Sequence, residues 1–235
     1  MIRVRLYQSV TRSNKRGATL SSGYAHRMET VRKLTRREEY AQATRQAIQD
    51  AARKLFAERG YFATKVDDIA AEARVAPATV YAVAGGKRGL LDGVVQSWTS
   101  DPIVERNAAQ IAVSDDPVEI IRDVASGVRH MREQWSDVIR LLLTTAPHDS
   151  DVAEQLETAT DTYRAAFVPV AKRLAKLGAL RPDINVPAAV DLLWFYFGYS
   201  SYFTLHDDNH WSYQRAEQWL ADQACRTLLA AGGKK

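Results

Sequence analysis

Apolar residues recur every three or four positions along most of the chain, and polar residues fill the positions between them. This spacing places apolar side chains on one face of a helix. A clear example is the stripe of Ala47, Ile48, Ala51, Ala52, Leu55 and Phe56. Gly60 follows this stripe, and glycine commonly ends a helix because it accepts a positive φ. No alternating strand pattern and no internal repeat is present, so the sequence predicts an all-α protein.

The periodicity and the Pro and Gly positions give the expected order of helices. A short helix is possible at 29–37, and residues 1–38 are otherwise expected to be unstructured. The remaining expected helices cover 39–59, 66–73, a short segment beginning at 77, 87–100, 102–112, 117–135, 136–145, 151–177, 187–206 and 212–231. Pro169 lies inside the expected helix 151–177, where a proline removes one backbone hydrogen bond and bends the helix.

Residues 65–84 contain two short helices joined by about three residues. Thr64 precedes the first helix, and Asp67 and Asp68 occupy its first turn, which is a typical start signal. Pro77 suits the first turn of the second helix, where its missing N–H would have no partner anyway. Two helices at this spacing form a helix-turn-helix, whose second helix can enter the major groove of DNA.

Residues 44–95 resemble the TetR family of bacterial transcriptional regulators. The residues that carry the resemblance are 55–61 (LFAERGY), Thr64, 68–70 (DIA), Val75, 79–81 (TVY), Lys87, Leu90 and Leu91. More loosely, the resemblance covers residues 40–230. It implies a three-helix helix-turn-helix DNA-binding domain at 39–100, with the motif at 65–84, and a helical ligand-binding and dimerisation domain at 101–235. The implied function is a transcriptional regulator rather than an enzyme, and we favour a repressor that a small apolar ligand releases.

The same resemblance assigns DNA contacts. Tyr81 and Lys87 match the family's phosphate-contacting tyrosine and lysine, and phosphate contacts set register rather than sequence choice. The other expected contacts are Thr44, Thr64, Lys65, Arg74, Pro77, Ala78 and Thr79. Three positions depart from the family pattern: Arg74 replaces a turn glycine, Ala76 a capping serine and Ala84 an aromatic residue. These departures leave open a helical enzyme or a ligand-binding protein on a degenerate scaffold of the same type.

Residues 187–206 are apolar on nearly every side, so they must be covered on nearly every side. In the resembled family the last two helices of each subunit form a four-helix dimer interface, which implies a homodimer on an inverted-repeat operator. The expected interface residues are Trp194, Phe197, Tyr202, Trp219 and Leu220. Aromatic and methionine residues of the middle helices form either plain core or an apolar ligand pocket. The pocket candidates are Val128, Met131, Trp135, Tyr163, Phe167, Phe195 and Tyr199.

Charge is unevenly distributed along the chain. Residues 1–40 hold ten Lys and Arg against three Asp and Glu, a net charge of +7, whereas residues 41–235 carry −3. Such a basic arm either contacts phosphates or remains a solvated tail. Met28 is an alternative translation start, which would remove much of this excess.

The remaining chemistry of the sequence is sparse. Cys225 is the only cysteine, so no internal disulfide forms, which fits a reducing cytoplasm. Residues 186–205 are long enough to span a membrane, but Pro187, two serines and three tyrosines argue against it. Residues 206–210 (HDDNH) are expected to form a loop between helices rather than a metal site. We therefore predict a cytoplasmic protein without a cofactor, a metal or a membrane segment.

Overall fold

The computed structural model describes residues 35–230, and every regular segment among them is helical. In chain order these are α1 (Arg36–Arg59), α2 (Val66–Glu72), α3 (Pro77–Ala84), α4 (Lys87–Thr99), α5 (Ile103–Val113), α6 (Pro117–Thr145), η1 (Ala146–His148), α7 (Ser150–Lys176), α8 (Val186–Phe197), α9 (Tyr199–Phe203), η2 (Thr204–Asp208) and α10 (Tyr213–Leu228). The predicted all-α class is confirmed. The predicted basic arm lies outside the described residues, apart from 35–38.

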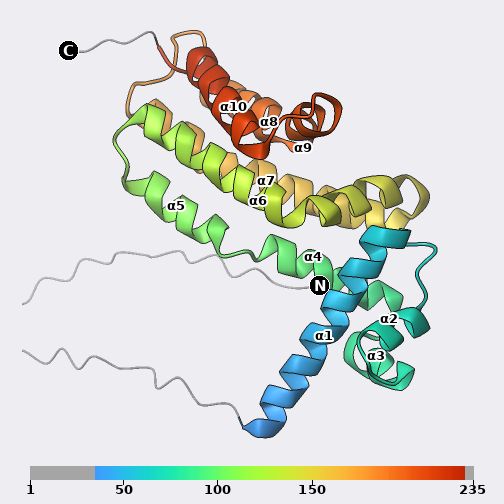
Figure 1. Ribbon diagram of the computed structural model, residues 1–235. Helices are drawn as coiled ribbons and strands as arrows, with labels where there is room; N and C mark the ends of the chain where they lie inside the picture. The colour runs from blue at the N-terminus through green and yellow to red at the C-terminus, as the bar shows by residue number, and fades with distance from the viewer. Residues whose placement is uncertain (1–34, 231–235) are drawn as a thin grey trace, which may run out of the picture.

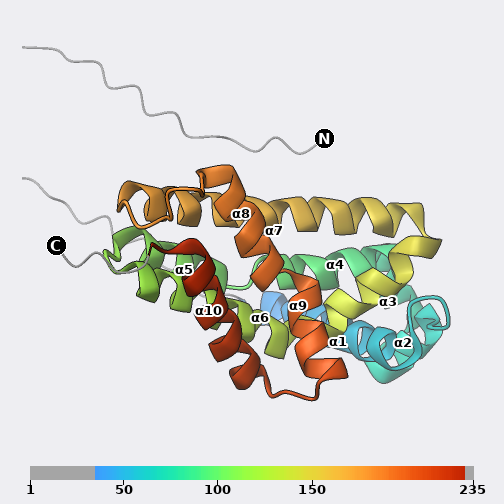
Figure 2. The same cartoon turned by 90° about the horizontal axis from the view of Figure 1, so that it is seen from above.

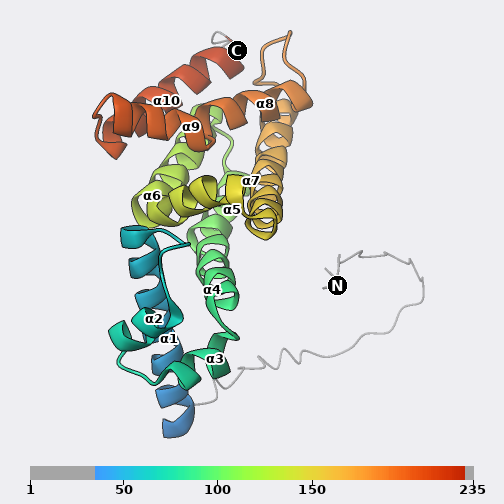
Figure 3. The ribbon, with the colours of Figure 1, turned by 90° about the vertical axis from the view of Figure 1, so that its right-hand side faces the viewer.

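The helices form an elongated molecule with two ends. Helices α1, α2 and α3 lie at one end, and α8, α9 and α10 lie at the other (Figures 1 and 3). Between them α6 and α7 run side by side, and α4 and α5 connect the two ends along one flank (Figure 1). Seen from above, α8 and α9 cross over α6 and α7 (Figure 2). The helix-turn-helix therefore lies far from the C-terminal helices.

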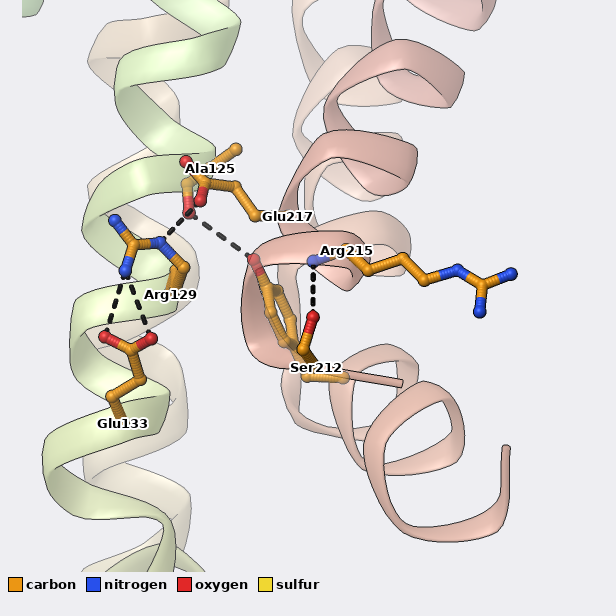
Figure 4. Close-up of polar contacts among 7 residues, drawn as sticks. Ala125, Arg129, Glu133, Ser212, Arg215 and Glu217 are labelled. Atoms are coloured by element: carbon orange, nitrogen blue, oxygen red, sulfur yellow. Dashed lines mark hydrogen bonds and ion pairs between the residues drawn. The ribbon is translucent and has the colours of Figure 1, made fainter. Parts of the chain in front are cut away.

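Short polar side chains fix where several helices begin. Thr35 and Glu38 form a reciprocal capping box, so α1 starts three residues before the predicted Glu39. Asp116 caps α6 and Asp149 caps α7, each by accepting two backbone N–H groups. The Ser212 hydroxyl accepts the Arg215 N–H at the start of α10 (Figure 4). These local bonds satisfy N–H groups that the first helical turn leaves unpaired.

Two apolar clusters form the core. The first combines α1–α4 with the C-terminal part of α6, the N-terminal part of α7, and Tyr199. The second combines α5, the other halves of α6 and α7, and helices α8–α10. Its α6–α10 contact is supported at the surface by Arg129, which binds Glu217 of α10 at 2.5 Å and Glu133 at 3.1 Å (Figure 4). Helices α6 and α7 thus belong to both clusters.

Two predicted helix boundaries are wrong. Residues 117–135 and 136–145 form a single helix, α6, because nothing interrupts it at Ser136, whose hydroxyl donates to the Arg132 carbonyl of the same helix. Conversely, the predicted helix 187–206 breaks at Gly198, where ψ is −176°. The chain continues as the short α9 and the π turn η2, so the break turns the aromatic residues of this region in different directions.

Candidate nucleic-acid interface and ligand cavity

The helix-turn-helix is attached firmly to α1. Ile69 and Ala70 of α2 and Val80 of α3 are buried in the first apolar cluster. At the surface Lys54 binds Glu72 at 2.8 Å and Arg59 lies 3.4 Å from Asp68, so two ion pairs join α1 to α2. These contacts fix the orientation of α2, and through it that of α3.

Helix α3 presents most of its surface to solvent. Val80 is its only buried residue, whereas Pro77, Ala78 and Tyr81 are exposed and Thr79 is half-buried. Pro77 occupies the first turn, and Ala76 at the N-cap offers no side-chain cap, as the sequence indicated. A helix anchored on one side and free on the other is suited to insertion into a groove.

The turn between α2 and α3 is a Schellman motif. The Val75 N–H donates to the Ala70 carbonyl at 3.0 Å, and the Arg74 N–H donates to the Ala71 carbonyl at 3.1 Å. Arg74 occupies the left-handed position of this motif with φ 55°, where glycine is usual. Its side chain is exposed beside the start of α3, so it is available to a ligand of the motif.

Tyr81 and Lys87 lie close together at the junction of α3 and α4. A Cβ atom on Gly86, the N-cap of α4, would lie 3.5 Å from the Tyr81 ring, so this ring lies beside the start of α4. The Lys87 ammonium donates to the Thr64 carbonyl at 3.1 Å and lies 4.5 Å from the centre of the Tyr61 ring. Partial burial lowers the pKa of Lys87. No side chain caps α4, so its N-terminal N–H groups add to the positive potential here.

One predicted DNA contact is wrong. Thr64 is buried, and its hydroxyl donates to the Gly60 carbonyl at 2.8 Å and to the Leu55 carbonyl at 3.1 Å. It therefore ties the loop to the end of α1 instead of capping α2 or facing DNA. Lys65 occupies the N-cap position and is exposed. Thr44 is half-buried in α1 and donates to the Tyr40 carbonyl at 2.9 Å.

A separate cavity lies between α5, α6 and α7, with a volume of about 240 Å³. Its wall is almost entirely apolar, and it is formed by Ile103, Val104, Asn107, Ala108, Ile111, Ala112, Val124, Gly127, Val128, Met131, Tyr163, Ala166, Phe167, Pro169, Val170 and Arg173. An engineered apolar cavity of about 150 Å³ holds benzene, so this cavity has room for a larger molecule.

The cavity includes four of the predicted pocket residues: Val128, Met131, Tyr163 and Phe167. The other three do not line it, so their prediction is wrong for this cavity. Trp135 donates its indole N–H to Asp101, Phe195 is exposed on α8, and Tyr199 is buried beside Trp98. The contribution of α5 was missed, although residues 103, 104, 107, 108 and 111 recur at helical spacing and indicate one apolar face.

Three predicted dimer residues are buried inside the subunit. Phe197 and Tyr202 are fully buried and Leu220 nearly so, all within the second apolar cluster. Because their side chains have no surface left for a partner, this part of the prediction is wrong. Trp219 of α10 is 43 % exposed and Phe195 of α8 is 67 % exposed, whereas Trp194 is half-buried.

Arg132 of α6 is a buried cation that sequence reasoning did not identify. Only 1 % of it is exposed, and it donates to the Phe197 carbonyl at 3.3 Å, at the break between α8 and α9. The rings of Tyr163, Tyr199, Tyr202 and Phe203 surround its guanidinium at 5.3–5.9 Å. Burial raises the pKa of Tyr163, whose hydroxyl donates to the same carbonyl at 2.6 Å.

A polar junction connects the cavity region with α1. Arg53 of α1 binds Asp137 of α6 at 2.7 Å and stacks 4.4 Å above the Trp135 ring. Trp135 in turn donates to Asp101 at 2.8 Å, and Asp101 accepts the Ile103 N–H at the start of α5. Because Ile103 also lines the cavity, a few side chains link the cavity wall to α1, which holds the helix-turn-helix.

The sequence also predicted that the protein has neither a metal site nor a membrane segment. Within residues 35–230 no cluster of His, Cys, Asp and Glu has the arrangement of a metal site. His206 stacks on Tyr213, and Asp207 pairs with Arg140, so the HDDNH segment has structural partners. Over the same residues no helix combines the length and the apolar character that a membrane crossing needs.

Comparison with known proteins agrees with this geometry. Residues 48–94 match the family model of bacterial regulatory proteins, tetR family. The uncharacterized HTH-type transcriptional regulator YdeS of Bacillus subtilis (strain 168) is 26 % identical over 163 residues, covering 65 % of this chain and 75 % of YdeS. Among solved structures, the SmeT–triclosan complex is similar with a TM-score of 0.69 at 19 % identity, covering 81 % of this chain and 94 % of that one. A putative transcriptional regulator from Saccharomonospora viridis in complex with choline has a TM-score of 0.67 at 18 % identity. The match covers 81 % of this chain and 100 % of that one.

Proposed function

Since the chain belongs to the tetR family of bacterial regulatory proteins, and is thus a DNA-binding transcriptional regulator and not an enzyme, we propose that it is a repressor which a small apolar ligand releases from DNA. The observation that carries the proposal is the link between two sites. Helix α1 holds the exposed α3 through α2, and Arg53 of α1 contacts Trp135 and Asp137 of α6, just beyond Met131 of the cavity wall. We place the protein in the cytoplasm, where bacterial DNA is accessible.

In this proposal α3 enters the major groove. Tyr81 and Lys87 bind phosphates together with the N-terminus of α4, which attracts anions. Pro77 and Ala78 offer apolar contact, for example to a thymine methyl group. Lys65 at the start of α2 and Arg74 in the turn before α3 are both exposed, and Thr44 of α1 and Thr79 of α3 are proposed as further contacts.

A symmetric dimer would place two such helices on one DNA site. We propose that α8 and α10 form the interface through Phe195, Trp219 and the accessible part of Trp194. Two-fold symmetry then requires an inverted repeat with half-sites about one helical turn apart.

The ligand would occupy the cavity and bind more tightly to the arrangement of α5 and α6 that is incompatible with DNA binding. Ile103 would then move Asp101 and Trp135, and with them the contact of Arg53. The SmeT–triclosan complex shows that a protein of similar fold accommodates a small molecule.

Selection of bound sequences from random duplex DNA tests the DNA-binding part directly. Enrichment of an inverted repeat supports the proposal, whereas uniform binding to all sequences favours a ligand-binding protein on a degenerate scaffold. On the selected site Lys87→Ala and Tyr81→Phe should weaken binding on all sequences alike, and Lys87→Ala should lower the salt slope by about 1. A changed base preference with an unchanged slope would contradict the phosphate assignment.

A further inference from the structure

The cavity wall contains one formal charge. Among its sixteen lining residues only Asn107, Tyr163 and Arg173 carry polar side-chain groups. Asn107 donates to the Asp123 carbonyl at 2.8 Å, and the Tyr163 hydroxyl donates to the Phe197 carbonyl at 2.6 Å, so both are engaged elsewhere. Arg173 is therefore the side chain of the wall that distinguishes charged from neutral ligands.

Arg173 makes a hydrogen bond to a backbone carbonyl and an ion pair with an exposed carboxylate. Its Nε donates to the Ser114 carbonyl at 3.0 Å, which fixes the side chain against the loop after α5. Its Nη2 donates to Asp115 at 2.5 Å. The Arg173 side chain is only 18 % exposed, whereas that of Asp115 is 85 % exposed. An ion pair with such a hydrated partner contributes little, so another anion can replace Asp115 at small cost.

The position of Arg173 also sets the shape of the ligand. Tyr163 and Arg173 are ten residues apart on α7, which corresponds to about 15 Å along the helix axis. Ile111 and Ala112 lie at the end of α5, near Arg173, and Ile103 lies at its start. The cavity is thus an apolar slot with a cation at one end.

We propose that the effector of this cavity is an amphipathic monocarboxylate. This inference rests on the proposed function and deepens it by naming the ligand class. The apolar body lies between α5, α6 and α7, and the carboxylate pairs with the Arg173 guanidinium in place of Asp115. A guanidinium can donate two parallel N–H hydrogen bonds to the two oxygens of a carboxylate. A dianion such as a phosphate monoester would leave one charge uncompensated beside apolar walls, which is costly.

The test compares linear carboxylates from hexanoate to decanoate with the alcohols of equal chain length. Binding to the full chain is measured by titration calorimetry at pH 7.5, where the acids are ionised. The wild-type protein should bind the best acid more tightly than its alcohol. Arg173→Gln should weaken acid binding by about ten- to hundredfold while leaving alcohol binding unchanged.

Two variants serve as matched comparisons. Lys172→Gln removes the same charge from the neighbouring exposed position of α7, outside the wall, and should leave acid binding unchanged. Asp115→Asn removes the competing carboxylate and should tighten acid binding. The inference is overturned if no acid binds, if Arg173→Gln binds acids like the wild type, or if Lys172→Gln loses as much affinity.

A second readout separates this inference from the proposed function. Release of the selected DNA site is followed by fluorescence anisotropy with each acid and alcohol. If alcohols release the DNA site as effectively as acids, the proposed function as a ligand-released repressor stands. The assignment of a carboxylate ligand is then overturned. Acid binding that depends on Arg173 without any DNA release keeps the ligand class and rejects the proposed function.

Discussion

At the scale of single residues, two positions with the same backbone role carry different side chains. Arg74 ends α2 and Gly178 ends α7 in the same Schellman hydrogen-bond pattern, with φ 55° and 64°. Glycine adopts this conformation freely, whereas a residue with a Cβ atom pays on the order of 1 kcal/mol. Arg74 is therefore retained against a local cost, which fits a side chain that contacts DNA.

Replacing Arg74 separates these two effects. Arg74→Gly should raise the free energy of unfolding by up to about 1 kcal/mol, because the strain disappears. Arg74→Ala keeps the strain and should change stability little. Both variants should weaken binding to the selected DNA site equally, which gel shifts and thermal melts can measure. Loss of binding in Arg74→Gly alone would mean that backbone conformation, not the side chain, matters.

Residues with strong backbone preferences were predictable from the sequence. Gly60 ends α1 with φ 79°, and Pro77 begins α3. Thr64 was assigned the wrong role because a threonine before a helix either caps it or bonds backward, and only the packing of the loop decides. Arg173 was missed because its environment comes from three helices that are distant in the sequence.

At the scale of elements, the break between α8 and α9 shows where periodicity is insufficient. Residues 187–206 have no proline after Pro187, and a single helix was the natural prediction. However, a Cβ atom on Gly198 would lie 2.5 Å from the Trp194 carbonyl oxygen. The break also directs the Phe197 carbonyl toward Arg132, a long-range contact that the local sequence does not reveal.

Gly198→Ala should therefore lower the free energy of unfolding by about 1–3 kcal/mol, because the carbonyl of Trp194 must move. Chemical denaturation measures this change. Ser200→Ala, two residues later at an exposed position, is the control and should stay near the wild type. Equal stability of all three proteins would show that the break adapts easily.

The junction of α4, α5 and α6 should respond to acid. Burial alone would raise the pKa of Asp101, but hydrogen bonds from the Ile103 N–H and the Trp135 indole, together with nearby His130, outweigh it and lower this pKa below the ordinary value of an aspartate. A lowered pKa means that ionised Asp101 stabilises the fold above its unfolded-state pKa. This stabilisation is lost as the pH falls through the folded-state pKa.

Asp101→Asn should cost about 1–3 kcal/mol at pH 7, because it removes the charge from these hydrogen bonds. The difference from the wild type should shrink once the pH falls below about 4. Urea denaturation at several pH values measures both. A difference that is constant from pH 7 to pH 3 would contradict the assignment.

At the scale of the whole molecule, the outer surface of α8 and α10 is the best candidate for self-association. Phe195→Asp and Trp219→Asp place a charge on this surface and should split the dimer while the helices remain intact, with weaker DNA binding as a result. Light scattering and circular dichroism measure the two properties. Phe197→Asp is the contrasting variant, because it buries an unpaired charge in the core and should unfold the subunit. A folded dimer carrying Asp at both 195 and 219 would exclude this face.

The two apolar clusters share α6 and α7, and this affects how the molecule folds. The first cluster includes Val138, Ile139 and Leu142 of α6 and Val152 of α7. Residues 35–100 alone therefore do not form the whole cluster. We therefore expect that the DNA-binding end does not fold as an independent unit. Heat or denaturant should melt both ends in one cooperative transition. Grafting the first hundred residues onto another C-terminal body would therefore require the matching surfaces of α6 and α7 to be transferred as well.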